Sequence, residues 1–497
     1  MSEFDVEYDV IVIGGGGSGK SAAYTIATES DLSVCLLEKM EETGGTSRFA
    51  EGTCASESCE QNARTVPDFS GELPEGAHYP THEEHMKRYI DYSHHRANPD
   101  VVRSFVWNSG ETIEILKNIG VEWTMVSVYA FEQPLELYTF HRPEGLGERV
   151  QELLLRACVN EGIDIFTSTP AEKLIVEEGR VVGVVARDVD GNQLSMGAKA
   201  VILASGGFGN NMDLVRKYSW MPKVADVSIQ CTPTENTGDG LRMAVEAGGA
   251  IADIGALMIS SRAYKKTRES PLTAAGFQPT LWVNKRAKRF CDESVAHSFA
   301  DTGNTNALCE DGLMYVILDR AMLDHFEKNG SEIGLGDFIP YKQKVSGVDE
   351  AVREAERAHD GSAWKADTIE ELAASVGLDV DAFTQTVAHY NELCEKGHDE
   401  DFLKPSKYLF PITTPPYYCV LKSPSVLVSL GGIRVNGDMQ VTNDKYEPIP
   451  GLYAVGLDAT GLYGDTYNLD CPGTANGFAH TSGRIAARHA IETIKSE

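Results

Sequence analysis

The sequence predicts an α/β protein in which a discontinuous dinucleotide-binding domain is interrupted by an inserted α+β capping domain. Two segments near opposite ends of the 497-residue chain carry this prediction. The apolar run 10–13 leads into the glycine-rich segment 14–19, and the apolar run 452–455 ends at Gly456. A strand that enters a glycine-rich turn is typical of a dinucleotide site. If both segments serve one site, the residues between them contain an insertion.

The composition limits the classes of protein to consider. With 42% hydrophobic residues, the chain has enough apolar side chains for two or three domains. The net charge of −30 disfavours nucleic acid and anionic membranes as partners. We find no apolar run of about 18 residues and no basic leader, and we expect a cytoplasmic protein.

The ten cysteines include no C-x-x-C pair. The spacing of Cys54 and Cys59 fits neither a zinc site nor an iron–sulfur cluster. We therefore expect buried thiols in a reducing compartment and no metal site.

The first 40 residues have the pattern of a βαβ unit. Residues 8–13 and 32–37 are predicted strands, and residues 19–29 are a predicted helix. Gly14, Gly16 and Gly19 have the spacing that lets a backbone approach a pyrophosphate at a helix N-terminus. Glu38 ends the second strand, where a carboxylate would accept hydrogen bonds from a ribose.

The same glycines also fit a phosphate loop, because Gly19 is followed by Lys20 and a serine. The strand 316–319, which ends in Asp319, resembles the metal-binding strand of such NTPases. However, that strand lies far along the chain, and neither Glu38 nor the loop at Gly456 has a role in this interpretation. We therefore favour FAD, which would make the protein yellow.

The remaining elements define the domain boundaries. Residues 174–176, 181–185 and 200–203 are predicted strands. Charged helices at 348–359 and 368–396 and proline-rich connections mark the cap, and a final helix spans 474–494. We expect the FAD domain at 1–254 and 430–497 and the capping domain at 255–429.

Three further segments fit a flavin site. Residues 43–47 follow Glu38, residues 204–209 follow an apolar strand, and residues 472–475 open the last helix. A helix N-terminus stabilises a nearby anion by about 0.3–1 kcal/mol, which suits the reduced flavin. The candidate FAD-binding residues are Gly14, Gly16, Ser18, Gly19, Glu38, Lys39, Gly44, Gly45, Thr46, Ser47, Gly52, Ala171, Ser205, Gly206, Gly207, Asp239, Gly456, Asp458, Gly473, Thr474 and Ala475.

Together these motifs resemble the flavoprotein family of fumarate reductases and succinate dehydrogenases, together with ketosteroid dehydrogenases. The resemblance lies in segments 14–19, 44–45, 204–207, 237–240, 283–290, 431–432 and 482–486. It implies a glutathione-reductase-like Rossmann FAD domain, a mobile cap, and a small-molecule substrate held between them. Because the histidine that carries covalent flavin is missing near residues 45–47, the resemblance implies noncovalent FAD.

The departures from this family bear on the substrate. Where fumarate reductases have His, Arg, His and Arg, this chain has Ser260, His297, Val428 and Asp470. Buried carboxylates need cationic donors, and an aspartate in place of an arginine would repel a dicarboxylate. We therefore expect that fumarate and succinate are not substrates.

Four residues are candidate catalytic groups. Segment 461–467 resembles the Gly-x-Thr-Tyr stretch of ketosteroid dehydrogenases, in which a tyrosine acts on a ring carbonyl. Tyr463, Tyr467, Asp470 and His297 would form a neutral, aromatic pocket for a cyclic or phenolic substrate. In the alternative interpretation both tyrosines pack and His297 caps a helix. Tyr129 and segment 141–143 are weaker candidates.

Within the family, tracts 38–47 and 50–54 resemble enzymes that reduce isoflavonoids. This resemblance implies reductive removal of a ring hydroxyl, with hydride from flavin N5, His297 as the acid and Asp470 or a tyrosine as the base. The alternatives are a ketosteroid dehydrogenase or enoate reductase, and a flavin-binding protein without turnover. No second Gly-x-Gly-x-x-Gly segment marks a nicotinamide site, so the donor is either transiently bound NAD(P)H or a separate electron carrier.

Overall fold

The computed structural model describes residues 4–497, except 64–72, 74–75, 131–134, 229–231 and 268. Its larger part is built on an eight-stranded sheet with the order β17-β18-β9-β1-β2-β6, in which β7 pairs with β8 and β8 with β9. The five strands from β18 to β6 are parallel. The members of the sheet are β1 (Val6–Ile13), β2 (Val34–Leu37), β6 (Asp164–Phe166), β7 (Ala171–Glu177), β8 (Arg180–Arg187), β9 (Gln193–Leu203), β17 (Gln440–Thr442) and β18 (Pro448–Ala454).

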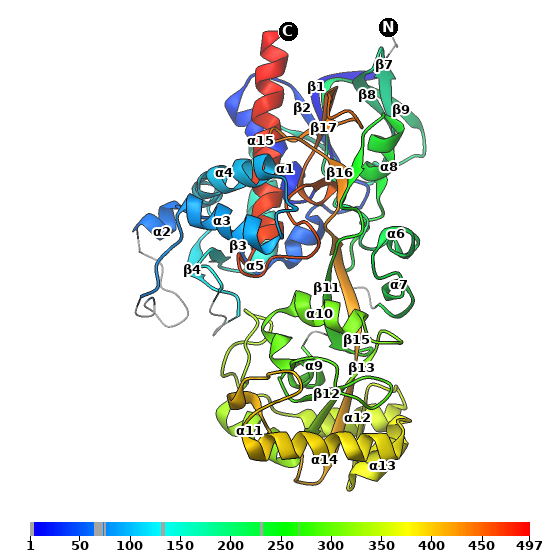
Figure 1. Cartoon of the computed structure of the whole chain (residues 1–497). Coiled ribbons are helices and arrows are strands. Elements are labelled where there is room, and N and C mark those ends of the chain that lie inside the picture. The colour runs from blue at the N-terminus through cyan, green and yellow to red at the C-terminus, as the bar shows by residue number, and fades with distance from the viewer. Residues whose placement is uncertain (1–3, 64–72, 74–75, 131–134, 229–231, 268) are drawn as a thin grey trace.

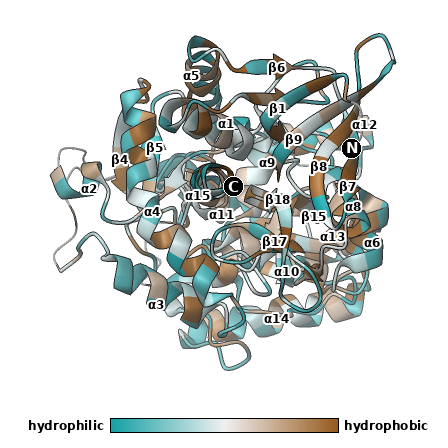
Figure 2. Cartoon of the chain, turned by 90° about the horizontal axis from the view of Figure 1, so that it is seen from above, coloured by the Kyte–Doolittle hydropathy of each residue, from teal (hydrophilic) through white to brown (hydrophobic). Residues whose placement is uncertain are grey.

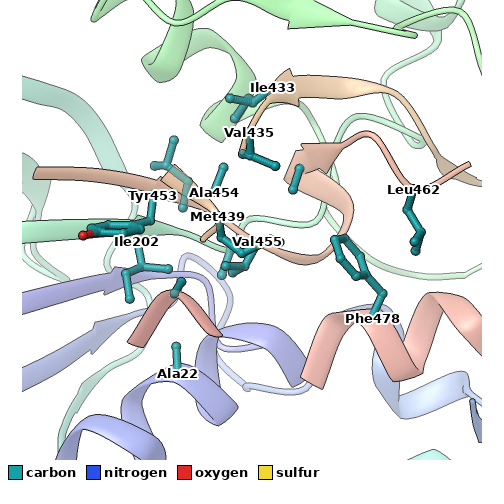
Figure 3. Close-up of a cluster of buried hydrophobic side chains, with 14 of the residues drawn as sticks. Ala22, Ile202, Ile433, Val435, Met439, Tyr453, Ala454, Val455, Leu462 and Phe478 are labelled. Atoms are coloured by element: carbon teal, nitrogen blue, oxygen red, sulfur yellow. The ribbon is translucent and has the colours of Figure 1, made fainter. Parts of the chain in front are cut away.

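The two ends of the chain meet in this sheet. Strand β18 pairs with β9 beside β1, and the last helix, α15 (Thr474–Ser496), packs against α1 (Gly17–Glu29). Figure 3 shows part of the core that joins them, which includes Ala22 of α1, Phe478 of α15, Ile202 and Tyr453. The glycine-rich loop after β1 therefore lies at the carboxyl edge of the parallel strands, where α/β sheets bind ligands.

A second sheet is drawn from residues 257–429. Its order is β11-β15-β13-β12, with β14 paired to β15. Strands β11 (Leu257–Ala263) and β15 (Tyr417–Ser429) run between the two parts of the molecule (Figure 1). The others are β12 (Leu281–Val283), β13 (Met314–Asp319) and β14 (Ala363–Ala366). The division of the chain into an FAD domain and a capping domain at residues 255 and 429 stays a prediction.

Helices surround this second sheet. They are α9 (Pro271–Gly276), α10 (Phe299–Ala307), α11 (Arg320–Asn329), α12 (Val348–Ala358), α13 (Ile369–Val376) and α14 (Val380–Lys396). The single helix expected at 368–396 is two helices. Gly377 ends α13 in the left-handed region with φ 79°, and the Asp379 side chain caps α14. Figure 2 shows hydrophilic and hydrophobic stretches on α14, whose Phe383, Val387 and Tyr390 are buried.

Smaller elements complete the part of the chain between β2 and β6. Helices α2 (Cys59–Ala63), α3 (His82–Tyr92), α4 (Pro99–Asn118) and α5 (Leu146–Asn160) accompany a three-stranded sheet of β3 (Thr53–Cys54), β4 (Trp123–Ser127) and β5 (Phe140–Pro143). A three-residue helical turn, η4 (Gly456–Asp458), follows β18. In the described part of the chain, no helix is long and apolar enough to cross a membrane.

Candidate functional site

A cavity of about 2120 Å³ runs from the carboxyl edge of the main sheet to the cap. It is lined by segments from both ends of the chain and from β11 and α10. Of the candidate FAD-binding residues, those that line it are Gly14, Gly16, Ser18, Glu38, Lys39, Gly45, Thr46, Ser47, Gly52, Ala171, Ser205, Gly206, Asp239, Gly473 and Ala475.

The glycine-rich loop has the geometry that a dinucleotide site needs. Gly14 has φ 112°, and a Cβ there would lie 2.2 Å from the Ala204 carbonyl oxygen. A Cβ on Gly19 would lie 1.8 Å from the Gly14 oxygen, so this glycine lets α1 pack against the strand end. At Gly16 the nearest atom to a Cβ is 4.0 Å away, and α1 begins there without a side-chain cap. Gly17 and Ser18 of its first turn line the cavity, so the N-terminus of α1 is directed at it.

Two charged contacts border the nucleotide end of this cavity. Glu38 accepts hydrogen bonds from the backbone N–H groups of Gly15 and Met40, each at 2.9 Å. Lys39 Nζ lies 2.8 Å from Asp239 Oδ2 and 2.7 Å from Thr237 Oγ1. Lys39 and Asp239 stand 200 positions apart in the chain, so this ion pair ties the end of β2 to the start of α8 (Asp239–Glu246).

The other candidate FAD-binding residues lie behind the cavity surface and do not line it. Asp458 is buried and accepts hydrogen bonds from Ser205 Oγ at 3.0 Å and from the Gly207 N–H at 2.9 Å. Asp458 therefore holds the loop after β9 rather than reaching a ligand. Gly456 donates its N–H to Ser482 Oγ at 2.9 Å. Gly19, Gly44, Gly207 and Thr474 likewise do not line the cavity.

The phosphate-loop interpretation does not fit this geometry. Lys20 is fully buried, does not line the cavity, and donates from Nζ to the Gln151 carbonyl oxygen at 3.0 Å. Burial lowers its pKa to about 8. Asp319 caps α11 and accepts hydrogen bonds from the N–H groups of residues 413 and 414 in the cap. The glycine cradle therefore fits the pyrophosphate of FAD, while the Lys20 side chain is held away from it.

The cavity continues beyond the glycine loops into an aromatic section. The Tyr129 ring lies edge-on to Phe140 and to Phe299, with centroids 5.5 and 5.8 Å apart. Phe299 is stacked on Tyr467, with centroids 5.9 Å apart and an interplanar angle of 28°. These four rings line the cavity, and we call them the aromatic wall. Apolar side chains extend this surface at Met258, Phe338, Leu427, Val428 and Leu469.

Tyr467 connects the aromatic wall to the last helix. Its hydroxyl oxygen accepts the Ala475 N–H at 3.4 Å, at the first turn of α15. Burial raises the pKa of Tyr467 well above its ordinary value. Among the described residues, no acceptor takes the Tyr467 hydroxyl proton. Tyr467 can therefore donate a hydrogen bond to a ligand oxygen in this cavity.

His297 lies outside this cavity. It ends the short helix η2 (Glu293–His297) and lines a separate cavity of about 640 Å³. Its Nε2 is 3.1 Å from the Tyr408 hydroxyl. Two residues later in the chain, Phe299 faces the large cavity instead.

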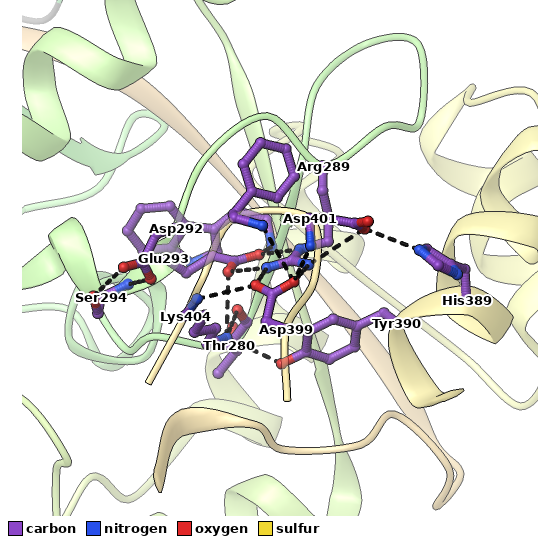
Figure 4. A network of polar contacts seen from close by, with 12 residues as sticks. Thr280, Arg289, Asp292, Glu293, Ser294, His389, Tyr390, Asp399, Asp401 and Lys404 are labelled. Carbon is purple, nitrogen blue, oxygen red and sulfur yellow. Dashed lines mark hydrogen bonds and ion pairs between the residues drawn. The ribbon is translucent and has the colours of Figure 1, made fainter. Parts of the chain in front are cut away.

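A buried ionic network fixes the start of η2. Arg289 Nη2 lies 2.8 Å from Glu293 Oε2 and 2.8 Å from Asp399 Oδ2. Lys404 Nζ is 3.4 Å from Glu293 and 3.0 Å from the Tyr390 hydroxyl. Figure 4 shows these side chains converging from η2, α14 and the loop after α14.

Asp470 and Tyr463 lie behind the aromatic wall rather than in the cavity. Asp470 Oδ2 is 3.6 Å from Arg88 Nη1, and burial raises the pKa of Asp470 to about 6. Tyr463 is stacked on Tyr467 with centroids 5.8 Å apart, and its hydroxyl has no hydrogen-bond partner among the described residues. The structure therefore brings Tyr463, Tyr467 and Asp470 to one region and places His297 at a separate cavity.

Two features of this region were not expected from the sequence. Phe299 completes the aromatic wall, and Glu136 accepts the backbone N–H of Ala130, beside Tyr129, at 3.0 Å. Burial raises the pKa of Glu136. No local motif marks either residue. Ser260 and Val428, expected from the departures, do line the cavity.

The structure offers no metal centre in the residues it describes, where no group of three or more His, Cys, Asp or Glu side chains could hold an ion. The cysteines within those residues are free thiols.

Comparisons with known proteins agree with this geometry. The family model described as "FAD binding domain" matches residues 9–471. A vinyl phenol reductase of Lactiplantibacillus plantarum is 33% identical over 98% of this chain and 96% of that protein. An NADH:acrylate oxidoreductase of Vibrio harveyi is 28% identical, and the match covers 98% of this chain but only 50% of that protein.

Among solved structures, a 3-ketosteroid delta1-dehydrogenase from Sterolibacterium denitrificans matches with a TM-score of 0.77 and 20% identity. That match covers 98% of this chain and 100% of that one. At this identity the likeness concerns the fold alone. It confirms the predicted class, an α/β FAD-binding fold with a capping domain.

Proposed function

The chain belongs to the FAD binding domain family and is an FAD-dependent oxidoreductase. We propose that it reduces a cyclic, phenolic substrate. The observation that carries the proposal is the aromatic wall, which continues directly from the residues that fit FAD. Aromatic rings bind other rings by offset or edge-on packing. The name of the vinyl phenol reductase points to the same chemical class.

Within this class we propose an isoflavonoid, with tetrahydrodaidzein reduced to equol. In that reaction the ring C–O bond breaks, the hydroxyl leaves as water with one added proton, and a C–H bond forms in its place. FAD, when bound and reduced by the electron donor, would supply the hydride from N5. The chain must orient the ring, exclude water and supply the proton.

Tyr467 is the proposed hydrogen-bond donor to the substrate. It lines the cavity, and its oxygen already accepts an N–H from the start of α15, so its proton points to another acceptor. A neutral phenol donates a hydrogen bond without placing a charge in the site. The proposed roles of Tyr463 and Asp470 become indirect, because both would act on Tyr467 from behind.

His297 remains a candidate acid, but it would need to turn toward the large cavity. A comparison of His297→Gln with Tyr467→Phe separates the two candidates. Tyr467 as the donor predicts that Tyr467→Phe slows substrate reduction while His297→Gln leaves it near the native rate. The reverse result would favour His297 as the acid.

The residues at the positions of the fumarate reductase cations support rejection of dicarboxylates. Ser260 and Val428 line the cavity and are 5% and 3% exposed. Neither can neutralise a carboxylate, which is costly to bury without a cation. We therefore propose that fumarate and succinate are not substrates.

A ketosteroid dehydrogenase or an enoate reductase is the alternative on the same fold. Product analysis distinguishes the candidates: chemically reduced holoenzyme is incubated without oxygen with tetrahydrodaidzein, 4-vinylphenol, a 3-ketosteroid and a cinnamate. Formation of equol supports the proposal. Turnover of the ketosteroid or the cinnamate alone would contradict it.

The electron donor is proposed to be NAD(P)H, bound transiently, or a separate electron carrier. Anaerobic mixing of the oxidised enzyme with NADH or NADPH tests the first source directly. Rapid bleaching of the flavin absorbance would favour the nicotinamide, and no bleaching would favour a carrier.

A further inference from the structure

The junction between η2 and α10 presents Phe299, and not His297, to the large cavity. The two residues are separated by Ser298 alone, yet they line different cavities. The Ser298 backbone is extended, with φ −115° and ψ 114°, and its Oγ caps α10 by accepting the Asp301 N–H at 3.1 Å. The chain leaves η2 at His297 and enters α10 at Phe299, and the two side chains lie in different surroundings.

The Phe299 ring is held from both sides. It is stacked on Tyr467 at 5.9 Å and lies edge-on to Tyr129 at 5.8 Å, and it is 8% exposed. Helix α10 is also tied to the loop that carries Tyr467, because Asn304 Nδ2 donates to Thr466 Oγ1 at 2.8 Å. The Phe299 ring is therefore held in place by its neighbours, and it is the apolar ring that helix α10 of the cap contributes to the aromatic wall.

We propose that Phe299 is a specificity-determining residue that selects flat aromatic rings over saturated rings of similar size. This inference deepens the proposed function and rests on it for the identity of the substrate. An aromatic ligand gains the face and edge contacts of Phe299 and its two neighbours, whereas a saturated ring gains only area burial.

A binding measurement tests Phe299 independently of turnover. The FAD-loaded enzyme is titrated with p-cresol and with its saturated counterpart 4-methylcyclohexanol, and binding is followed by the change in flavin absorbance. The wild-type enzyme is expected to bind p-cresol more tightly. Phe299→Leu keeps an apolar side chain but loses the ring, and we expect the preference for p-cresol to fall about 3- to 10-fold.

Two further variants keep the test decisive. Phe299→Tyr retains a ring and should keep the preference. Phe326→Leu makes the same change in the core of the cap, on α11 and away from the large cavity, and should also keep it. A folded Phe299→Leu that keeps the preference overturns the inference, and so does an equal loss in Phe326→Leu. If Phe299→Leu is poorly folded, loss of the preference in Phe299→Tyr overturns it instead.

A wild-type enzyme with no preference for p-cresol overturns the inference as well. Failure of the proposed function appears separately, as an enzyme that prefers p-cresol in this titration but turns over no phenolic substrate.

Discussion

At the scale of one residue, the proposed function depends on the hydroxyl of Tyr467. Tyr467→Phe removes one preorganised donor and leaves the ring stacked on Phe299. We expect kcat/KM for the phenolic substrate to fall about 100-fold, as for the loss of one such donor in other enzymes. FAD content should not change, because the oxygen accepts only a backbone N–H from α15.

Steady-state kinetics on the purified holoenzyme measures the effect. Tyr446→Phe removes the hydroxyl of a tyrosine that is 74% exposed, and it should behave like wild type. Equal kinetics for the two variants would remove Tyr467 from the reaction.

Asp470 should make the stability of the protein depend on pH. Its pKa is raised to about 6, mainly by burial, which outweighs the lowering by Arg88 and is assisted by nearby Asp301. The folded protein then binds the Asp470 proton more tightly than the unfolded chain does. The stabilisation is present below about pH 4, the ordinary range of an aspartate, and is lost as the pH rises through about 6.

Asp470→Asn removes this titration. Between pH 4 and 6, we expect the free energy of unfolding of wild type to fall relative to the variant by up to about 3 kcal/mol. Urea unfolding at several pH values measures the difference. Curves that stay parallel across this window would show that Asp470 does not titrate near pH 6.

At the scale of an element, the turn between β1 and α1 should depend on the missing Cβ of Gly14. Gly14→Ala would place that atom 2.2 Å from the Ala204 oxygen, so β1 and β9 must separate. We expect loss of bound FAD, measured as the ratio of flavin to protein absorbance. Gly179→Ala is the matched control, because Gly179 also has a positive φ of 82° but nothing lies within 4 Å of its Cβ. If Gly179→Ala lost FAD equally, the loss of FAD in Gly14→Ala would be explained by general backbone strain.

The ionic network that begins η2 makes a second prediction at this scale. Glu293→Gln leaves Arg289 and Lys404 with fewer buried negative partners, and removing one partner of a buried pair costs about 3–5 kcal/mol. The free energy of unfolding in urea measures this loss. Glu350→Gln is the control, since Glu350 pairs with Arg353 and Arg357 on the surface and should cost no more than about 1 kcal/mol. Similar losses in both variants would contradict the role of the network.

For the whole molecule, the sequence was most informative where signals are local. The strand–glycine–helix pattern at residues 8–29 predicted β1 and α1, and the apolar runs at 181–185 and 200–203 predicted β8 and the end of β9. Each element of this kind follows from its own periodicity and turn residues. The continuous helix expected at 368–396 was wrong at Gly377, where a left-handed glycine ends one helix and Asp379 begins the next.

The site was predictable only in part, because its aromatic wall is assembled from distant segments. Tyr129, Phe140, Phe299 and Tyr467 belong to four separate parts of the chain, and no spacing connects them. The cofactor cradle, by contrast, is carried by compact glycine motifs. His297 and Phe299 show the same limit on a small scale, since they are separated by one residue and yet line different cavities.

The proposed function requires that this flavin site binds an aromatic ring and rejects a dicarboxylate. Stopped-flow reoxidation of the photoreduced enzyme without oxygen tests the claim most directly, with tetrahydrodaidzein and fumarate compared at equal concentration. We predict that tetrahydrodaidzein restores the yellow oxidised flavin while fumarate leaves it reduced. Reoxidation by fumarate, or by neither compound nor any other phenolic ring, would contradict the account.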